Sequence, residues 1–190
     1  KDEIINIKEI IDLFEINKLS KSSSIFSYKK LNFFNNFYLR NDTGLKKFLE
    51  YCASNDMLKK YILEDKNKII KIFEVYKKDL NNFFEILDIV DIYFDNNFKY
   101  NKNETFDDEF KIIYNDFLEN IMGIDIWNRE NIQNNISNFI VSKNIKFPIL
   151  GKPIRFLLIN SYNGPSISDI FDILGKKLSI DRLNQYIEKN

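Results

Sequence analysis

The sequence has 190 residues, of which 44% are hydrophobic and 15% aromatic, so the chain is too apolar to be disordered and can bury a sizeable core. Lys plus Arg and Asp plus Glu both number 28, which leaves no net charge as an overall sign of nucleic-acid binding. Histidine is absent, which excludes Ser-His and Cys-His catalysis and most transition-metal sites. We therefore expect neither catalytic residues nor a metal site in this stretch.

The sequence contains no run of about 18 uncharged apolar residues, the length that a membrane-spanning helix needs. The opening Lys1-Asp2-Glu3 lacks the basic and apolar regions of a signal peptide, so we expect a cytoplasmic protein. The single cysteine, Cys52, has no partner for a disulfide, and its apolar neighbours predict a buried side chain.

Apolar residues recur at spacings of three and four along nearly the whole chain, a pattern that predicts an all-α fold. An amphipathic helix is predicted over 4–14, a loop rich in Ser and Lys over 18–28, and a second helix over 30–40. Thr43 or Asp42 is expected to cap the next helix.

The middle of the chain offers fewer boundaries. Between residues 57 and 94, apolar spacing predicts two or three packed helices whose connections no Gly or Pro marks. Residues 95–104 are the most polar stretch and are predicted to be a linker or a surface excursion. A capping box of Thr105 and Asp108 is expected to begin a helix that Gly123 ends.

Turn residues punctuate the last third of the sequence. After a helix predicted over 128–142, Pro153 is expected in the first turn of a helix. Ser166 is expected to cap a short helix that Gly175 ends, and Ser179 is expected to cap the last one.

Arginine is scarce while Lys and Asn are abundant, a skew that we attribute to AT-rich coding. Each arginine has withstood this drift, so all four are candidates for a functional or structural role: Arg40, Arg129, Arg155 and Arg182. We expect nearly all Phe side chains in the core and keep Trp127, Tyr162 and Tyr100 as surface candidates for base stacking.

Two segments carry motifs in a fixed order. Near the end, Gly151-Lys152-Pro153-Ile154-Arg155 leads, nine residues after Arg155, into Gly164-Pro165 and then into a helix that ends at Gly175. Near the start, the segment 9–40 closes with Asn35, Tyr38 and Arg40 in an Asn-x-x-Tyr-Leu-Arg pattern. Together these segments resemble bacterial-type glutamyl-tRNA synthetases, in the part that follows the tRNA stem-contact region.

The resemblance implies an all-α anticodon-binding architecture. Residues 1–40 would form the tail of the stem-contact region, residues 41–97 a first helical anticodon-binding subdomain, and residues 98–190 a second. The full enzyme would attach glutamate to tRNA(Glu) with ATP and Mg²⁺, none of whose chemistry or cofactors belongs to this chain. tRNA is the implied partner, and a monomer is expected.

The resemblance also implies which residues read the anticodon. Arg155 matches a family arginine whose planar guanidinium can hydrogen-bond or stack on a splayed base. The alternative is an ion pair with Asp169 or Asp172. The turn that follows would present backbone groups and a small apolar surface to the anticodon, or would serve only as a turn and helix cap: Gly164, Pro165, Ser166 and Ile167.

Lys18-Leu-Ser-Lys21-Ser22 is similar to the loop with which class I synthetases hold ATP phosphates. We reject that role, because the sequence has no histidine for the partner motif and no nucleotide-binding domain before residue 18. It matches instead a later family element, in which Lys21 would contact the tRNA backbone as a flexible point charge. Asn35, Tyr38 and Arg40 are expected to fix a helix junction.

Discriminating members of the family carry an arginine in the first anticodon-binding subdomain. Alignment places that position near Ile70 or Lys71, and no arginine occurs between Arg40 and Arg129. We therefore expect Lys71 to contact the anticodon of a non-discriminating enzyme that also charges tRNA(Gln). The competing interpretation is a non-enzymatic, all-helical module that binds protein or RNA.

Overall fold

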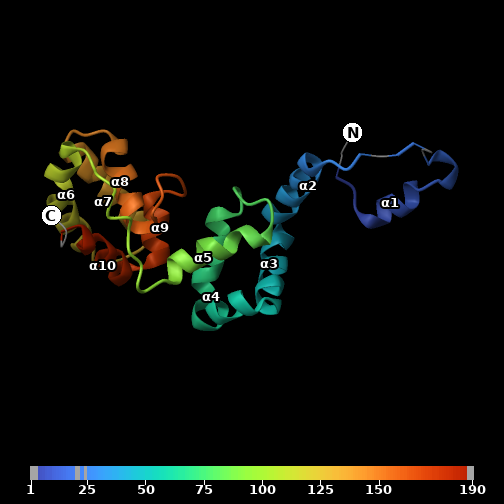
Figure 1. Cartoon of the computed structure of the whole chain (residues 1–190), viewed down its shortest axis with the longest axis horizontal. Coiled ribbons are helices and arrows are strands. Elements are labelled where there is room, and N and C mark those ends of the chain that lie inside the picture. Colours follow the sequence, from blue (N-terminus) through green and yellow to red (C-terminus); the bar gives the residue numbers. More distant parts are fainter. Residues whose placement is uncertain (1–3, 20–21, 24, 188–190) are drawn as a thin grey trace.

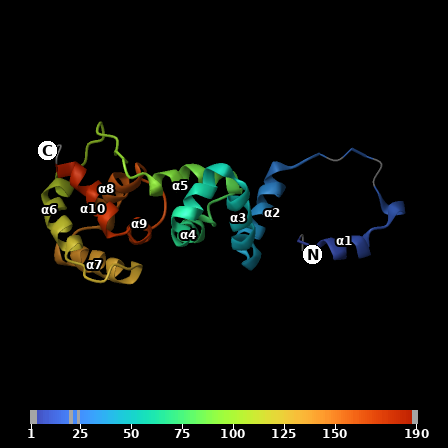
Figure 2. The same ribbon diagram turned by 90° about the horizontal axis from the view of Figure 1, so that it is seen from below.

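A computed structural model describes residues 4–19, 22–23 and 25–187. Over these residues the chain forms ten α-helices, two short 3₁₀ helices and no strand, which confirms the predicted all-α fold. The helices lie in an extended row, with α1 and α2 at one end, α3 to α5 in the middle and α6 to α10 at the other end (Figures 1 and 2).

The first part of the chain contains α1 (Ile7–Leu13), the 3₁₀ helix η1 (Ile16–Lys18) and α2 (Tyr28–Arg40). Between residues 4 and 38 none of the described residues is buried. Large apolar side chains are exposed on both helices and between them: Ile7, Ile10, Ile11, Leu13, Phe14, Ile16, Leu19, Ile25, Phe26, Tyr28, Leu31, Phe33 and Phe37. The residues described up to 38 therefore form no core of their own, and in this part Leu39 near the end of α2 is buried.

The middle group consists of α3 (Asp42–Ser54), α4 (Asp56–Tyr76), η2 (Phe83–Glu85) and α5 (Ile86–Phe94). Asn41 caps α3 by accepting from the Thr43 amide at 3.0 Å, so the expectation of a Thr43 or Asp42 cap was wrong by one or two residues. The stacked rings of Phe48 and Phe73 lie 4.3 Å apart at the centre of the group.

The backbone of α4 is kinked at Asp65, whose φ of −153° and ψ of 91° are not helical. The Asp65 carboxylate accepts from the Lys68 amide at 2.9 Å and so caps the second half of the helix. The kink turns the second half, which carries Lys71 and Tyr76, against the last group of helices; α4 and α5 both pack on α9.

The last group consists of α6 (Asp108–Met122), α7 (Arg129–Ser142), α8 (Phe147–Ile159), α9 (Ile167–Leu174) and α10 (Lys176–Ile187). Ser166 caps α9 and Gly175 ends it, as predicted. Buried faces of all five helices join one hydrophobic cluster with the middle group.

Three predicted helix starts in the last group were wrong. Asp107 stands at the N-terminal cap of α6, and no capping box forms with Thr105. α8 begins at Phe147, with Pro148 in its first turn, so Pro153 lies inside the helix, where it is buried. α10 begins at Lys176, directly after Gly175, which leaves Ser179 as a buried residue of the helix rather than its cap. Tertiary packing outweighed local signals at these positions.

The polar segment 95–104 contains no helix, but it is not a simple surface excursion. Phe98 and Tyr100 are only 6% and 2% exposed, so their rings anchor the segment in the core. Burial also rules out Tyr100 as a surface candidate for stacking. Among the helices described, none is both long and apolar enough to cross a membrane.

Candidate functional site

The turn that connects α8 to α9 brings most of the predicted site residues together. Asn160, with a positive φ of 54°, ends α8, and Gly164 has a φ of 137° that an L side chain rarely adopts. A Cβ at Gly164 would also lie 3.9 Å from the Tyr76 hydroxyl of α4. The turn thus needs glycine for its backbone shape and lies where the middle and last groups of helices meet.

Arg155 of α8 donates hydrogen bonds to two backbone carbonyls of this turn. Its Nε donates to the carbonyl of Pro165 at 3.0 Å and its Nη1 to the carbonyl of Tyr162 at 2.8 Å. Nη2 has no hydrogen-bond partner among the residues that the structure describes. Burial lowers the pKa of Arg155, an effect that the neighbouring Tyr76 and Tyr93 hydroxyls oppose. The guanidinium is therefore fixed by two carbonyls while one of its nitrogens stays available.

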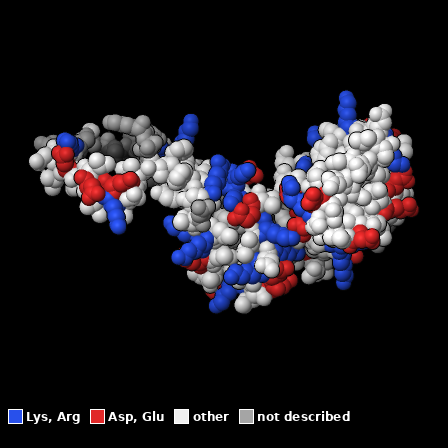
Figure 3. Space-filling view, turned by 180° about the vertical axis from the view of Figure 1, so that it is seen from behind, with Lys and Arg blue, Asp and Glu red and all other residues white. Residues whose placement is uncertain are grey.

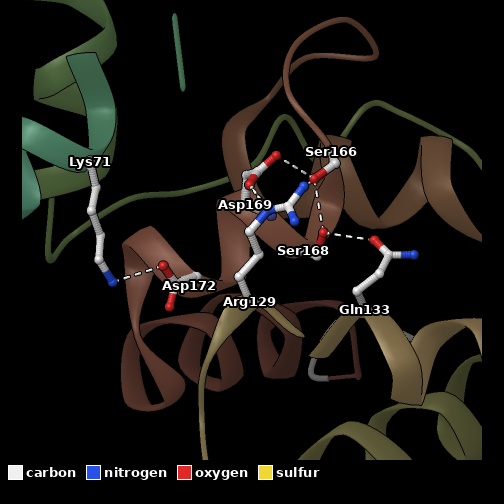
Figure 4. A network of polar contacts seen from close by, with 7 residues as sticks. All are labelled: Lys71, Arg129, Gln133, Ser166, Ser168, Asp169 and Asp172. Carbon is white, nitrogen blue, oxygen red and sulfur yellow. Dashed lines mark hydrogen bonds and ion pairs between the residues drawn. The ribbon is translucent and has the colours of Figure 1, made fainter. Parts of the chain in front are cut away.

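The suggested ion pair between Arg155 and Asp169 or Asp172 does not form. Asp169 pairs instead with Arg129, the first residue of α7, and Asp172 pairs with Lys71 of α4, at 2.7 Å (Figure 4). Both carboxylates lie on α9, one helical turn apart, and each faces a cation from a different element.

The first turn of α9 is organised by Ser166. Its hydroxyl accepts from the Asp169 amide at 3.1 Å and lies 2.5 Å from the Asp169 carboxylate. Ser168 is buried and donates to the Gln133 side chain of α7 at 2.8 Å (Figure 4). Ile167 is only 1% exposed, so its side chain belongs to the core and only its backbone can face a ligand.

Lys71 reaches this region from the other group of helices. Its side chain is 49% exposed, whereas that of its partner Asp172 is 19% exposed. The structure therefore joins Lys71, through Asp172, to the helix that begins with the Gly164–Ser166 turn. The remaining predicted contact, Lys21, lies outside the described residues.

Sequence reasoning missed Tyr76 and Tyr93 as part of this region. The hydroxyls of Tyr76 and Tyr93 lie 3.0 Å apart behind Gly164, and burial raises the pKa of both. Their spacing in the sequence is that of ordinary core residues, so no sequence signal could have found them. Trp127 is half-buried and donates to the Phe171 carbonyl of α9 at 3.0 Å, which ties it to the same helix.

Exposed lysines are frequent on α3, α4 and the loop after them. Figure 3 shows Lys and Arg side chains spread over the middle of the molecule, with Asp and Glu gathered at the outer edge of the last group. The exposed lysines of this middle region are Lys46, Lys47, Lys59, Lys60, Lys66, Lys71 and Lys78. Such side chains can neutralise phosphates without reading sequence.

Arg40 is the anchor of the expected helix junction. It ends α2, and its guanidinium donates to the Lys78 carbonyl that follows α4. Asn36 lies within 3.5 Å of Asn81 in the same loop. Within the described ranges, no group of three or more Asp, Glu, Cys or His side chains is placed to hold a metal ion.

Residues 46–187 match the protein family described as "Anticodon binding domain". The chain is 26% identical over 199 residues to the glutamate–tRNA ligase of Ligilactobacillus salivarius (strain UCC118), and this alignment covers 100% of the chain and 40% of the relative. It is 28% identical over 191 residues to the ligase of Mycoplasma capricolum subsp. capricolum, with 97% and 39% covered. The chain thus spans about two fifths of these relatives.

A solved structure has the same fold. It is that of a glutamate tRNA ligase from Elizabethkingia meningosepticum CCUG26117 in complex with its amino acid, which superposes with a TM-score of 0.81 at 24% identity. The superposition covers 98% of this chain and 37% of that structure.

Proposed function

The chain belongs to the anticodon-binding domain family, and on that premise we propose that it recognises the anticodon of tRNA(Glu) as one part of a glutamate–tRNA ligase. The two relatives described above align with nearly the whole chain, and each is named a glutamate–tRNA ligase. The whole ligase would attach glutamate to tRNA(Glu). Residues 41–97 and 98–190 are assigned as its two anticodon-binding subdomains, and residues 1–40 as the end of its stem-contact region.

The observation that carries the proposal is the anchored Arg155 beneath the Gly164–Pro165 turn. Two carbonyls fix the guanidinium, so it would meet a base without the entropy cost of ordering a free side chain. Its Nη2 can donate to a base edge, and the first backbone N–H groups of α9 can do the same without any charged side chain. Gly164, Ser166 and Ile167 would serve through their backbone, and Pro165, which has no N–H, through its ring as a small apolar surface.

Contacts to tRNA phosphates would come from lysines. We assign this role to Lys21 and to the exposed lysines of the middle group other than Lys71, which supply a contribution to binding that weakens as salt rises. Anticodon contacts that form fully only when the acceptor end is correctly seated would also favour the right transition state.

ATP and Mg²⁺ would bind in the part of the ligase that this chain does not include. The residues that the structure describes offer no set of carboxylates placed for a metal ion. The exposed apolar side chains between residues 7 and 37 would pack against that other part of the ligase.

The position at which discriminating relatives would carry an arginine falls near Ile70 or Lys71, and we propose that the ligase also charges tRNA(Gln). Lys lacks the bidentate fork with which an arginine selects one base edge. An aminoacylation assay of the full-length enzyme tests this directly. Strong rejection of tRNA(Gln) alongside rapid charging of tRNA(Glu) would overturn the idea.

The proposed function is tested by titrating the chain with glutamate tRNA and with the same tRNA changed, at the third anticodon base, to a base that neither tRNA(Glu) nor tRNA(Gln) carries there, at two salt concentrations. The wild-type chain should prefer the native anticodon. Arg155→Ala should weaken that binding by about 1–3 kcal/mol and reduce the preference. Lys21→Ala should weaken both tRNAs equally.

A third variant separates the charge of Arg155 from its shape. Arg155→Lys keeps the positive charge, so the salt dependence should persist while the anticodon preference falls. If the wild-type chain showed no preference, an all-helical interaction module would become the better interpretation.

A further inference from the structure

Helix α9 carries two carboxylates that are both neutralised by cations from other elements. Asp169 in its first turn pairs with Arg129 of α7, and Asp172 one turn later pairs with Lys71 of α4 (Figure 4). The first pair lies within the last group of helices. The second pair crosses from the middle group, so it is the polar contact that ties α4 to the helix leading from the candidate site.

The two side chains of the Lys71–Asp172 ion pair differ in their exposure to solvent. Asp172 is 19% exposed and held against the protein, whereas Lys71 is 49% exposed. A lysine ammonium has three hydrogen-bond donors, and Asp172 engages it at 2.7 Å. The Lys71 ammonium therefore keeps hydrogen-bond donors that face solvent. Its ion pair with Asp172 sets the direction of the lysine side chain.

This geometry couples Lys71 to the turn. Asp172 lies six residues after Ser166 on the same helix, about 9 Å along its axis. Arg155 fixes the other side of that turn through the Pro165 carbonyl. The carboxylate that holds the Lys71 ammonium and the backbone of the turn thus belong to the same short helix and its N-terminal cap.

We propose that Asp172 is a positioning residue for anticodon specificity, which holds the Lys71 ammonium in register with the Gly164–Ser166 turn. The inference rests on the proposed function and adds to it a residue that need not touch RNA. An exposed ion pair contributes little to stability, so the value of this one lies in placing a flexible lysine. Lys71 free of Asp172 would still attract phosphate, but its ammonium would no longer be held toward the anticodon.

Removing the charge of Asp172 should affect overall tRNA affinity and anticodon preference differently. Asp172→Asn removes a negative charge near the RNA, so binding to every tRNA should stay within about threefold or become tighter. The ratio of affinities between the native anticodon and the third-base variant should nevertheless fall by about tenfold. A residue with only a structural role would instead weaken both tRNAs and lower the thermal midpoint.

Asp116→Asn is the matched control. This variant also removes a carboxylate from a partly exposed ion pair, that of Asp116 with Lys143 directly after α7, but neither residue lies on α4 or α9. It should leave the affinity ratio unchanged. Asp172→Glu, which keeps the carboxylate, should restore most of the ratio.

Dependence on Lys71 is tested by combining variants. Lys71→Met should lower the affinity ratio on its own, and adding Asp172→Asn should lower it no further, because Asp172 acts through Lys71. An undiminished ratio in Asp172→Asn, or additive losses in the double variant, would overturn the inference. No anticodon preference in the wild-type chain would instead overturn the proposed function, and this inference with it.

Discussion

At the scale of single residues, Arg182 shows how a scarce arginine can be structural. Its side chain is only 1% exposed and donates to the carbonyls of Leu158 in α8, Ile92 in α5 and Asp95 just after α5. These carbonyls belong to the ends of two helices, where they lack helical partners and carry partial negative charge. Burial lowers the pKa of Arg182 to about 10, so the side chain stays charged at neutral pH.

Replacing Arg182 should therefore loosen the junction between the two groups of helices. Arg182→Met keeps the length of the side chain but leaves three carbonyls without their donor, and we expect a loss of roughly 3–5 kcal/mol in unfolding free energy. Arg40→Met is the control, since the exposed Arg40 donates to one carbonyl and should cost about 1 kcal/mol or less. Chemical denaturation measures both, and equal losses would contradict this account.

At the scale of elements, the join of α2 to α3 depends on a close backbone approach. A Cβ at Gly44 would lie 2.2 Å from the Leu39 carbonyl oxygen, so the two helices could not keep their present contact with any larger residue. Gly123 differs, because a Cβ there would have no neighbour closer than 3.4 Å and its φ of −71° suits any residue.

Gly44→Ala should therefore destabilise the chain while Gly123→Ala should not. We expect a loss of about 1–3 kcal/mol for the first, from forced displacement of α2. The second should be neutral or stabilising by about 0.4–1 kcal/mol, because alanine restricts the unfolded chain. Thermal or urea unfolding distinguishes them, and matching losses would show that the contact with Leu39 is not limiting.

At the scale of the whole molecule, a cysteine thiol and several tyrosine hydroxyls are buried, and burial favours their neutral, protonated form. Burial raises the pKa of the Cys52 thiol from 9.0 to about 12, and it raises the pKa of Tyr76, Tyr93 and Tyr114 as well. Cys52 has no exposed surface, which confirms its predicted place in the core. The folded state therefore holds these protons more tightly than the unfolded chain does.

This difference sets the direction of the pH dependence. The stabilising contribution is complete below the unfolded pKa values, near 9 for Cys and 10 for Tyr, and is lost as pH rises from them toward the raised pKa values of the folded state. Unfolding free energy should be flat from pH 7 to 8.5 and should fall by pH 11, with about 2–3 kcal/mol of the loss due to Cys52. Cys52→Ala should show a correspondingly smaller fall between the same pH values. Equal stability of the wild-type chain at pH 7 and 11 would contradict the burial argument.

The sequence alone determined the all-α class, the Ser166 cap, the Gly175 stop and the motif linking Arg155 to Gly164-Pro165, because helical periodicity and turn chemistry are local properties. Only the tertiary structure decided that Arg155 holds two carbonyls rather than Asp169 or Asp172. It likewise decided that Lys71 meets Asp172, that Tyr100 is buried and that Pro153 lies within a helix. These contacts join residues from different elements, and packing chooses among partners that local sequence leaves equivalent.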